Sequence, residues 1–156
     1  MDVVGYALAS SLEFVTDIWM KRTPMPTARE SLAAVSVSGK IYAIGGFQNS
    51  TVTYQSVNES YDPFTNTWET KAPMPNTLSL AGGCAINGKI YVIRSSGSDN
   101  LSYDPVTNTW ETKASMPSSR SVPAVATVND KMYVVGGGTS SPTNQVYDPS
   151  TNTWET

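Results

Sequence analysis

A ten-residue phrase, Tyr-Asp-Pro-x-Thr-Asn-Thr-Trp-Glu-Thr, occurs three times in this chain of 156 residues. The copies occupy Tyr61–Thr70, Tyr103–Thr112 and Tyr147–Thr156, at spacings of 42 and 44 residues. A period of this size indicates a tandem array of supersecondary modules, because one such module cannot bury its apolar face without a neighbour. The repeat therefore constrains the architecture more tightly than it constrains the function.

Each repeat contains four segments with the composition of β-strands. The first is small and apolar, and the second alternates in the way a half-buried strand does. The third ends at Tyr-Asp-Pro, and the fourth carries the tryptophan. We expect first strands at Leu32–Val37, Leu80–Ile86 and Pro123–Val128, and second strands at Lys40–Gly46, Lys89–Ser95 and Lys131–Gly137.

Short turn sequences join these segments. The first and second strands are separated by Ser38-Gly39, Asn87-Gly88 and Asn129-Asp130, and Asn and Gly tolerate the positive φ of a type I′ hairpin turn. In the Asp-Pro-x-Thr-Asn turn, Asp can accept bonds from the turn backbone and Pro presets φ at the next position. The turn residues Asp62, Asp104 and Asp148 are therefore expected to be structural. Four antiparallel strands per repeat describe a β-propeller blade.

One tryptophan recurs at the same place in each repeat. These are Trp68, Trp110 and Trp154, with Trp19 in a fourth, partial copy. An indole can bury on the order of 200 Å², which is worth roughly 4–5 kcal/mol as an upper estimate. Recurrence at one repeat position favours packing between blades over stacking on a sugar or nucleotide.

Four elements recur in order along nearly the whole chain: Gly-Gly after the second strand, Tyr-Asp-Pro, the Trp, and Met-Pro-x-x-Arg leading into the next repeat. This combination resembles the kelch repeat, and the resemblance implies an all-β fold of kelch-type propeller blades with four antiparallel strands each. Its glycine positions are Gly45, Gly46, Gly136 and Gly137. The second repeat departs from the pattern with Arg94-Ser95 and Leu78, so we expect an altered loop path and one lost contact between blades there.

The pattern divides the chain into a partial blade at 1–22 and blades at 23–72, 73–114 and 115–156, about three and a half blades in all. Known propellers close with about four to eight blades, so we expect an incomplete ring. Three outcomes remain open: a fragment of a larger propeller, a ring closed by self-association, or a four-bladed ring completed by the N-terminal partial repeat.

Composition narrows the classes of function. The formal net charge is −3 with no basic cluster, which argues against a nucleic-acid footprint or a membrane-surface patch. No apolar run approaches the roughly 18 residues of a spanning helix, and no basic region of a signal peptide opens the chain. The compartment stays open, with the cytoplasm slightly favoured.

The sequence contains few residues that could support catalysis. The chain has no histidine, which removes Ser-His-Asp and Cys-His nucleophilic sites and most transition-metal sites. Gly83–Lys89 matches a phosphate loop, but Ile90 follows where Ser or Thr binds Mg²⁺, and strand–turn–strand explains the segment. Cys84 has no evident base and is expected to be a buried thiol. We expect no catalytic residue, no metal and no cofactor. An acid–base pair among the non-repeating carboxylates Glu13, Glu30, Glu59 and Asp99 is the catalytic alternative.

Antiparallel order sorts the connections onto two faces. The short repeat-encoded turns share one face, while the connections from second to third strand lie on the other and vary in length: Phe47–Val57, Ser95–Asn100 and Gly138–Gln145. On a rigid repeat scaffold, binding residues usually lie in the loops whose length and sequence the repeat does not fix. We expect partner contacts at Arg29, Gln48, Tyr54, Arg94, Asp99 and Arg120. Because Arg29 and Arg120 both follow Met-Pro in the repeat, clamping of adjacent blades is an equal alternative for them.

These features predict a non-catalytic protein-interaction scaffold that binds a protein partner through the variable loops. One alternative is an enzyme similar to the propellers that isomerise sialic acids at a central funnel. The other is a structural array that self-associates into a ring, since an open arc leaves edges that invite pairing with another chain.

Overall fold

The computed structural model describes residues 20–77, 80–137 and 144–156. Trp19, Leu78 and most of the predicted partial blade lie outside these residues. The described residues form fourteen β-strands and no helix, so the expected all-β fold is confirmed. Three four-stranded antiparallel sheets and one small hairpin account for all of these strands.

We call the three sheets blade 1, blade 2 and blade 3, and each follows the order of the chain. Blade 1 contains β1 (Ala33–Val37), β2 (Lys40–Ile44), β5 (Asn58–Asp62) and β6 (Thr67–Lys71). Blade 2 contains β7 (Leu80–Ile86), β8 (Lys89–Arg94), β9 (Asn100–Asp104) and β10 (Thr109–Thr112). Blade 3 contains β11 (Ala124–Val128), β12 (Lys131–Val135), β13 (Asn144–Asp148) and β14 (Thr153–Glu155). The hairpin of β3 (Phe47–Gln48) and β4 (Thr53–Tyr54) is inserted into blade 1 between β2 and β5.

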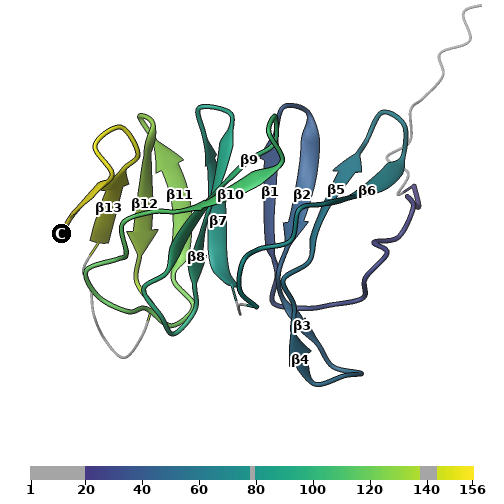
Figure 1. Cartoon of the computed structure of the whole chain (residues 1–156), viewed down its shortest axis with the longest axis horizontal. Coiled ribbons are helices and arrows are strands. Elements are labelled where there is room, and N and C mark those ends of the chain that lie inside the picture. Colours follow the sequence, from purple (N-terminus) through teal and green to yellow (C-terminus); the bar gives the residue numbers. More distant parts are fainter. Residues whose placement is uncertain (1–19, 78–79, 138–143) are drawn as a thin grey trace, which may run out of the picture.

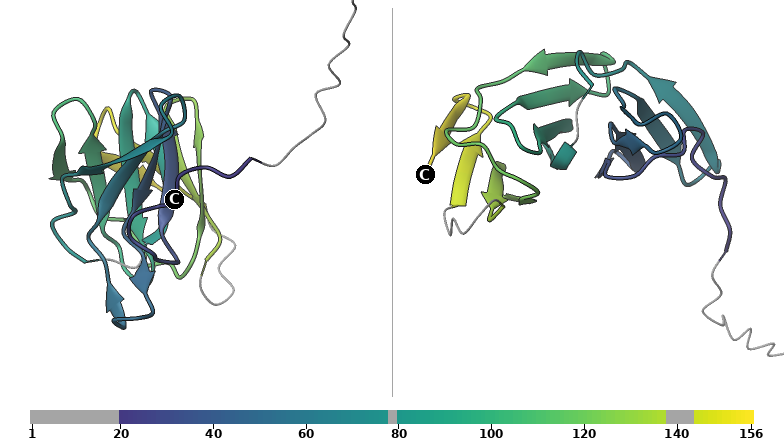
Figure 2. Two further views of the ribbon diagram at one scale, coloured as in Figure 1. Left: turned by 90° about the vertical axis from the view of Figure 1, so that its right-hand side faces the viewer. Right: turned by 90° about the horizontal axis from the view of Figure 1, so that it is seen from below.

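The blades stand side by side in an open arc (Figures 1 and 2). Their first strands line the concave side, where β7 contacts both β1 and β11. The fourth strands lie on the convex side. The described residues thus form an incomplete propeller ring, as the repeat count predicts.

The turn chemistry of the repeat is confirmed at both kinds of turn. Each hairpin between first and second strands has two residues with positive φ, as a type I′ turn requires: Ser38 and Gly39, Asn87 and Gly88, and Asn129 and Asp130. In the Asp-Pro turns, the aspartate oxygen accepts a backbone N–H two residues on, as in the bond of 2.9 Å from Phe64 to Asp62. The turn asparagine then adopts a positive φ, 58° at Asn66.

Two apolar clusters fill the junctions between blades. The first joins β1 and β2 of blade 1 to β8 and β9 of blade 2, with Ile44 and Ile90 fully buried. The second joins blade 2 to blade 3 in the same way, with Ile93 and Met132 fully buried. Each blade therefore buries one face only because a neighbour covers it, as expected for a tandem repeat of such modules.

The tryptophans link each blade to the connection that arrives from the preceding one. Trp110 donates its indole N–H to the carbonyl of Ala72 at 2.8 Å, and Trp154 donates to Ala114 at 2.7 Å. Asn58 in blade 1 donates to the same Ala72 carbonyl at 3.3 Å. All three described indoles are half-buried, so full burial of about 200 Å² overestimates their packing.

The path of blade 2 differs after its second strand. Gly45, Gly46, Gly136 and Gly137 all have positive φ where β2 and β12 end. Blade 2 has Arg94-Ser95 at this place, and its positive φ occurs one residue later, at Ser96. The non-glycine pair therefore moves the turn along the chain, as the sequence predicts. In the part of the chain that the structure describes, no helix is long and apolar enough to cross a membrane.

Candidate interaction face

The face that carries the connections from second to third strands is called the loop face. Among the described residues of this face, the β3–β4 hairpin extends beyond the end of blade 1 (Figure 1). Phe47 pairs with Tyr54 across the hairpin, and their rings lie 5.2 Å apart at 59°. On its other side Phe47 exchanges two backbone bonds with Glu30, of 2.9 and 2.7 Å. The hairpin is thus tied to the segment that enters blade 1.

The hairpin presents apolar and aromatic groups to solvent. Tyr54 is 53% exposed and Val52, at the tip, is 76% exposed. Val52 has a φ of 53°, a region that β-branched residues rarely occupy and that costs on the order of 1–3 kcal/mol. An exposed apolar residue in this conformation lowers the stability of the fold and gains no burial in return. Backbone strain of this kind is concentrated at binding sites.

Gln48 lies on the same hairpin and is held by its neighbours. Its side-chain oxygen accepts bonds from Gln55 at 3.2 Å and from Thr51 at 3.3 Å. Beside it, a shallow depression of about 320 Å³ lies between the hairpin and residues 28–30. The predicted residues Gln48 and Tyr54 therefore share one protruding element with an adjacent hollow.

Arg94, the last residue of β8, and Asp99, in the connection to β9, form an ion pair at 3.1 Å. Their side chains are 46% and 43% exposed. The backbone N–H of Arg94 also donates to the Asp99 carbonyl, at 3.1 Å, which closes the loop. Both predicted residues are thus accessible on the loop face, and each is the ion-pair partner of the other.

The side chain of Arg29 does not reach the surface. Its side chain has no exposed area, and its guanidinium lies 2.6 Å from Glu59 and donates to the Ala43 carbonyl at 2.7 Å. Thr27 donates to the other Glu59 oxygen at 2.7 Å. Arg29 therefore fastens the entering segment to β2 and β5 of blade 1, and this burial contradicts its predicted contact with a partner.

Arg120 is also buried, at 4% exposure. Its backbone carbonyl accepts the N–H of Ser96 at 2.7 Å, which joins the loop of blade 2 to the segment that enters blade 3. Both arginine side chains are thus buried within the protein. The hydrogen bonds and the ion pair of Arg29 stay within blade 1 and do not clamp adjacent blades, whereas Arg120 contacts the loop of blade 2 through its backbone carbonyl.

Sequence reasoning missed the residue that faces the arginine. In the alignment set by strand register, blade 1 has Glu59, blade 2 has Leu101 and blade 3 has Gln145 at one buried position. The arginine position changes with it, from Arg29 to Leu78 to Arg120. Leucine thus replaces both members in blade 2. The residues at the Arg29 and Glu59 positions change together from one repeat to the next, and this is the sequence signal that could have identified Glu59 as the partner of Arg29.

The fold and the repeat geometry agree with a comparison against protein families. The model of the Kelch motif matches residues 28–75 and 119–156, more than half of the chain. This chain belongs to the kelch-repeat family. The unmatched stretch includes Leu78 and Arg94-Ser95, where the second repeat departs from the pattern. No curated protein matches the chain. Kelch repeats generally mediate protein interactions and are typically non-catalytic.

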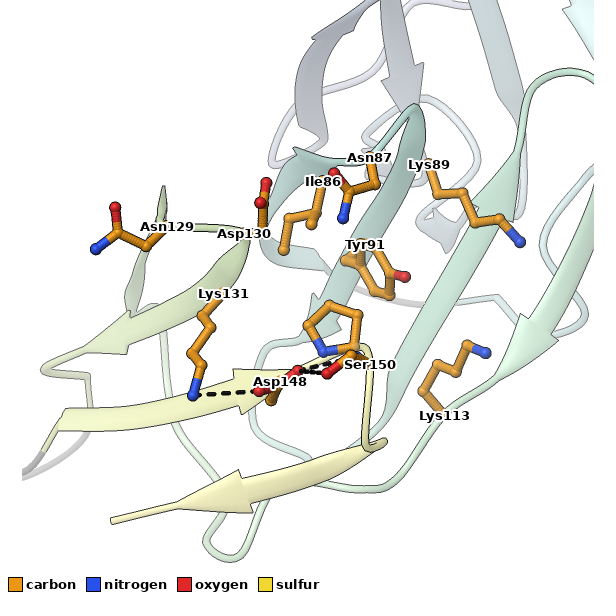
Figure 3. A pocket seen from close by; sticks show the side chains of 11 residues that line it. Ile86, Asn87, Lys89, Tyr91, Lys113, Asn129, Asp130, Lys131, Asp148 and Ser150 are labelled. Carbon is orange, nitrogen blue, oxygen red and sulfur yellow. Dashed lines mark hydrogen bonds and ion pairs between the residues drawn. The ribbon is translucent and has the colours of Figure 1, made fainter.

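The opposite face of these kelch blades carries the repeat-encoded turns. A depression of about 510 Å³ lies there between blade 2 and blade 3 (Figure 3). Each lysine that lines it is paired with a carboxylate: Lys89 with Asp104 at 3.4 Å, Lys113 with Glu111 at 2.7 Å, and Lys131 with Asp148 at 3.2 Å. Lys40 and Asp62 repeat the first of these pairs in blade 1, at 3.6 Å. The lysines of this pocket therefore take part in ion pairs within the blades.

Electrostatics at these kelch turns follow from hydrogen bonding. Bonds from Ser150 and the nearby Lys131 lower the pKa of Asp148 to about 2. The backbone N–H of Phe64 lowers the pKa of Asp62 in the same way. Burial raises the pKa of the Cys84 thiol, which makes it a poor nucleophile. Among the described residues, no group of three His, Cys, Asp or Glu side chains could hold a metal ion.

Proposed function

We propose that this protein is a non-catalytic protein-binding module whose loop face contacts a protein partner. The β3–β4 hairpin provides the main contact. The observation that carries this proposal is the protruding hairpin, with Tyr54 and Val52 exposed beside a hollow. Tyrosine is among the residues most often found at the energetic centre of protein interfaces. Gln48, Arg94 and Asp99 add polar groups to the same face.

The location of the hairpin supports the proposal. The corresponding connection of blade 2, between β8 and β9, is described and has no such hairpin, so a blade of this array does not require it. The rest of blade 1 follows the same strand order as the other blades. An inserted element with exposed apolar tips on a rigid support is the usual form of a loop-based recognition site.

The enzyme alternative gains no support from the site. Its arrangement would need arginine and glutamate side chains from successive blades to meet. Arg29 and Glu59 instead serve the same blade and neutralise each other in a buried pair.

The proposal is tested by site-specific photo-crosslinking in cells, with benzoylphenylalanine at position 54 or at position 64. Tyr54 and Phe64 are both exposed aromatic residues, and Phe64 lies on the opposite face, at an Asp-Pro turn. We expect a discrete protein to crosslink from position 54 and not from position 64. The purified partner should then bind the Tyr54→Ala variant at least tenfold more weakly in calorimetry, while Phe64→Ala leaves the affinity unchanged. Crosslinking from position 64 alone, or equal affinities, would overturn the proposal.

A further inference from the structure

Blade 3 exposes a face that the other two blades bury. Strand register makes Ile44, Ile93 and Val135 equivalent, because they pair with Ala33, Gly82 and Ala124 of the first strands. Ile44 and Ile93 are 0% exposed because the next blade covers them, whereas Val135 is 44% exposed. The end of the first strand repeats this contrast, with Val37 and Ile86 at 9% and 2% and Val128 at 49%. We call the surface around Val128 and Val135 the trailing face.

Blade 1 exposes the complementary surface. Ile41, Ile90 and Met132 are equivalent, because each pairs with the tyrosine of its Tyr-Asp-Pro sequence. Ile90 and Met132 are 0% exposed because the preceding blade covers them, whereas Ile41 is 40% exposed. We call the surface around Ile41 the leading face. Among residues 20–77, 80–137 and 144–156, the array therefore has one open face of each kind.

The two junctions inside the chain show how such faces fit. At the first junction, Ile44 of the trailing side and Ile90 of the leading side belong to the same buried cluster. At the second junction, Ile93 and Met132 do the same. The open faces carry Val135 and Ile41 at these positions, so apolar side chains of similar size would meet there.

We propose that the trailing face of one copy packs on the leading face of a second copy, so that two chains close one propeller ring. The occupant of each open face is then a blade of the same chain. Two arcs, each of the three described blades, give six, which lies within the range of about four to eight blades found in closed propellers. A two-fold axis along the ring centre makes both junctions identical, and this closed symmetry prevents further growth.

Closure also has a consequence for recognition. In a ring with its two-fold axis along the centre, the two β3–β4 hairpins lie on the same face of the ring. The protein would then present two copies of its loop face to a partner. A partner with two matching sites would be held more tightly than one site allows.

The test is light scattering coupled to size-exclusion chromatography on the full chain. The wild type is expected at twice the chain mass of 16.8 kDa. Val135→Glu on the trailing face and Ile41→Lys on the leading face should each give 16.8 kDa species. Both positions are already partly exposed, so circular dichroism should show unchanged strand content. Phe64→Lys is the matched control, because Phe64 is 97% exposed at a turn outside both faces and should leave the dimer intact.

Mixing the two variants provides the decisive result. In a mixed ring, one junction is wild-type and the other places the introduced glutamate of Val135→Glu against the introduced lysine of Ile41→Lys. An equimolar mixture should therefore recover the dimer. A wild type that stays at 16.8 kDa, or that grows beyond two copies, would overturn the proposal. Single variants that remain dimeric, or a mixture that stays monomeric, would show that these two faces do not meet.

Discussion

The guanidinium of Arg29 lies 2.6 Å from the carboxylate of Glu59, and the two side chains are 0% and 3% exposed. The pair joins the segment that enters blade 1 to the third strand of that blade. At the corresponding positions of the second repeat, both residues are leucine. The repeat sequence therefore accepts either two opposite charges or two leucines at these positions.

Breaking the pair on one side should destabilise the protein strongly. Arg29→Leu leaves the buried Glu59 carboxylate without its cation, so we expect a loss of about 3–5 kcal/mol in the free energy of unfolding. The double change Arg29→Leu and Glu59→Leu, which copies the second repeat, should recover most of that loss. Urea denaturation measures both. Arg94→Leu is the control, because its exposed pair with Asp99 is worth no more than about 1 kcal/mol. A double variant as unstable as the single one would contradict the interpretation.

Gly46 and Gly39 should respond very differently to substitution. Gly46 has a φ of 105°, and an added Cβ would lie 2.6 Å from the Glu30 carbonyl oxygen, which already accepts the Phe47 N–H. Gly46→Ala should therefore cost at least about 2 kcal/mol and displace the β3–β4 hairpin. Gly39 has open space around it, and the third repeat has Asp130 at its place with a φ of 59°.

Gly39→Asp is thus the matched control, and it should lower the free energy of unfolding by less than about 1 kcal/mol. Thermal melts of both variants provide the comparison. Equal losses would show that positive φ alone, and not the close approach to Glu30, makes Gly46 necessary.

The sequence predicts what the repeat itself specifies. The type I′ turns, the Asp-Pro turns and the antiparallel blades follow from local residue chemistry that recurs three times, so each copy supports the others. The loop-face position of Gln48, Tyr54, Arg94 and Asp99 was also predictable, because their connections vary in length. The burial of Arg29 and Arg120 was not predictable from the sequence. A side chain after Met-Pro can point toward solvent or into its blade, and only the partner at Glu59 decides that for Arg29. Half-burial of the indoles likewise depends on how far neighbouring blades overlap, which no single repeat encodes.

Trp110 allows the hydrogen bond and the packing of the indole to be separated. Its N–H donates to Ala72 at 2.8 Å, and its ring lies 5.0 Å from that of Tyr103. Trp110→Phe keeps an aromatic ring but loses the donor, so we expect a loss of about 1 kcal/mol. Trp110→Ala removes both contributions and should cost about 2–3 kcal/mol, below the range for fully buried aromatic residues because the indole is half-buried. Urea denaturation measures the two losses. A change under 0.5 kcal/mol for Trp110→Ala, where at least about 2 is expected, would show that the indole does not link the blades.

Asp148 should make the stability of blade 3 sensitive to acid. Its carboxylate accepts the hydroxyl and the backbone N–H of Ser150, at 2.6 and 2.9 Å, and lies near Lys131. These contacts lower its pKa to about 2 in the folded protein, against about 3.9 for an unfolded chain. A carboxyl with a depressed folded pKa stabilises the protein above the unfolded pKa, and this contribution is lost as the pH falls from about 4 toward 2.

The repeat supplies a matched variant, because the equivalent residue in blade 2 is Val106, which has no hydroxyl. In Ser150→Val, carbon-detected NMR titration should find the Asp148 pKa raised above about 2, and acid unfolding should begin at a higher pH. An unchanged pKa in that variant would show that the Ser150 hydroxyl does not hold the carboxylate in its charged form.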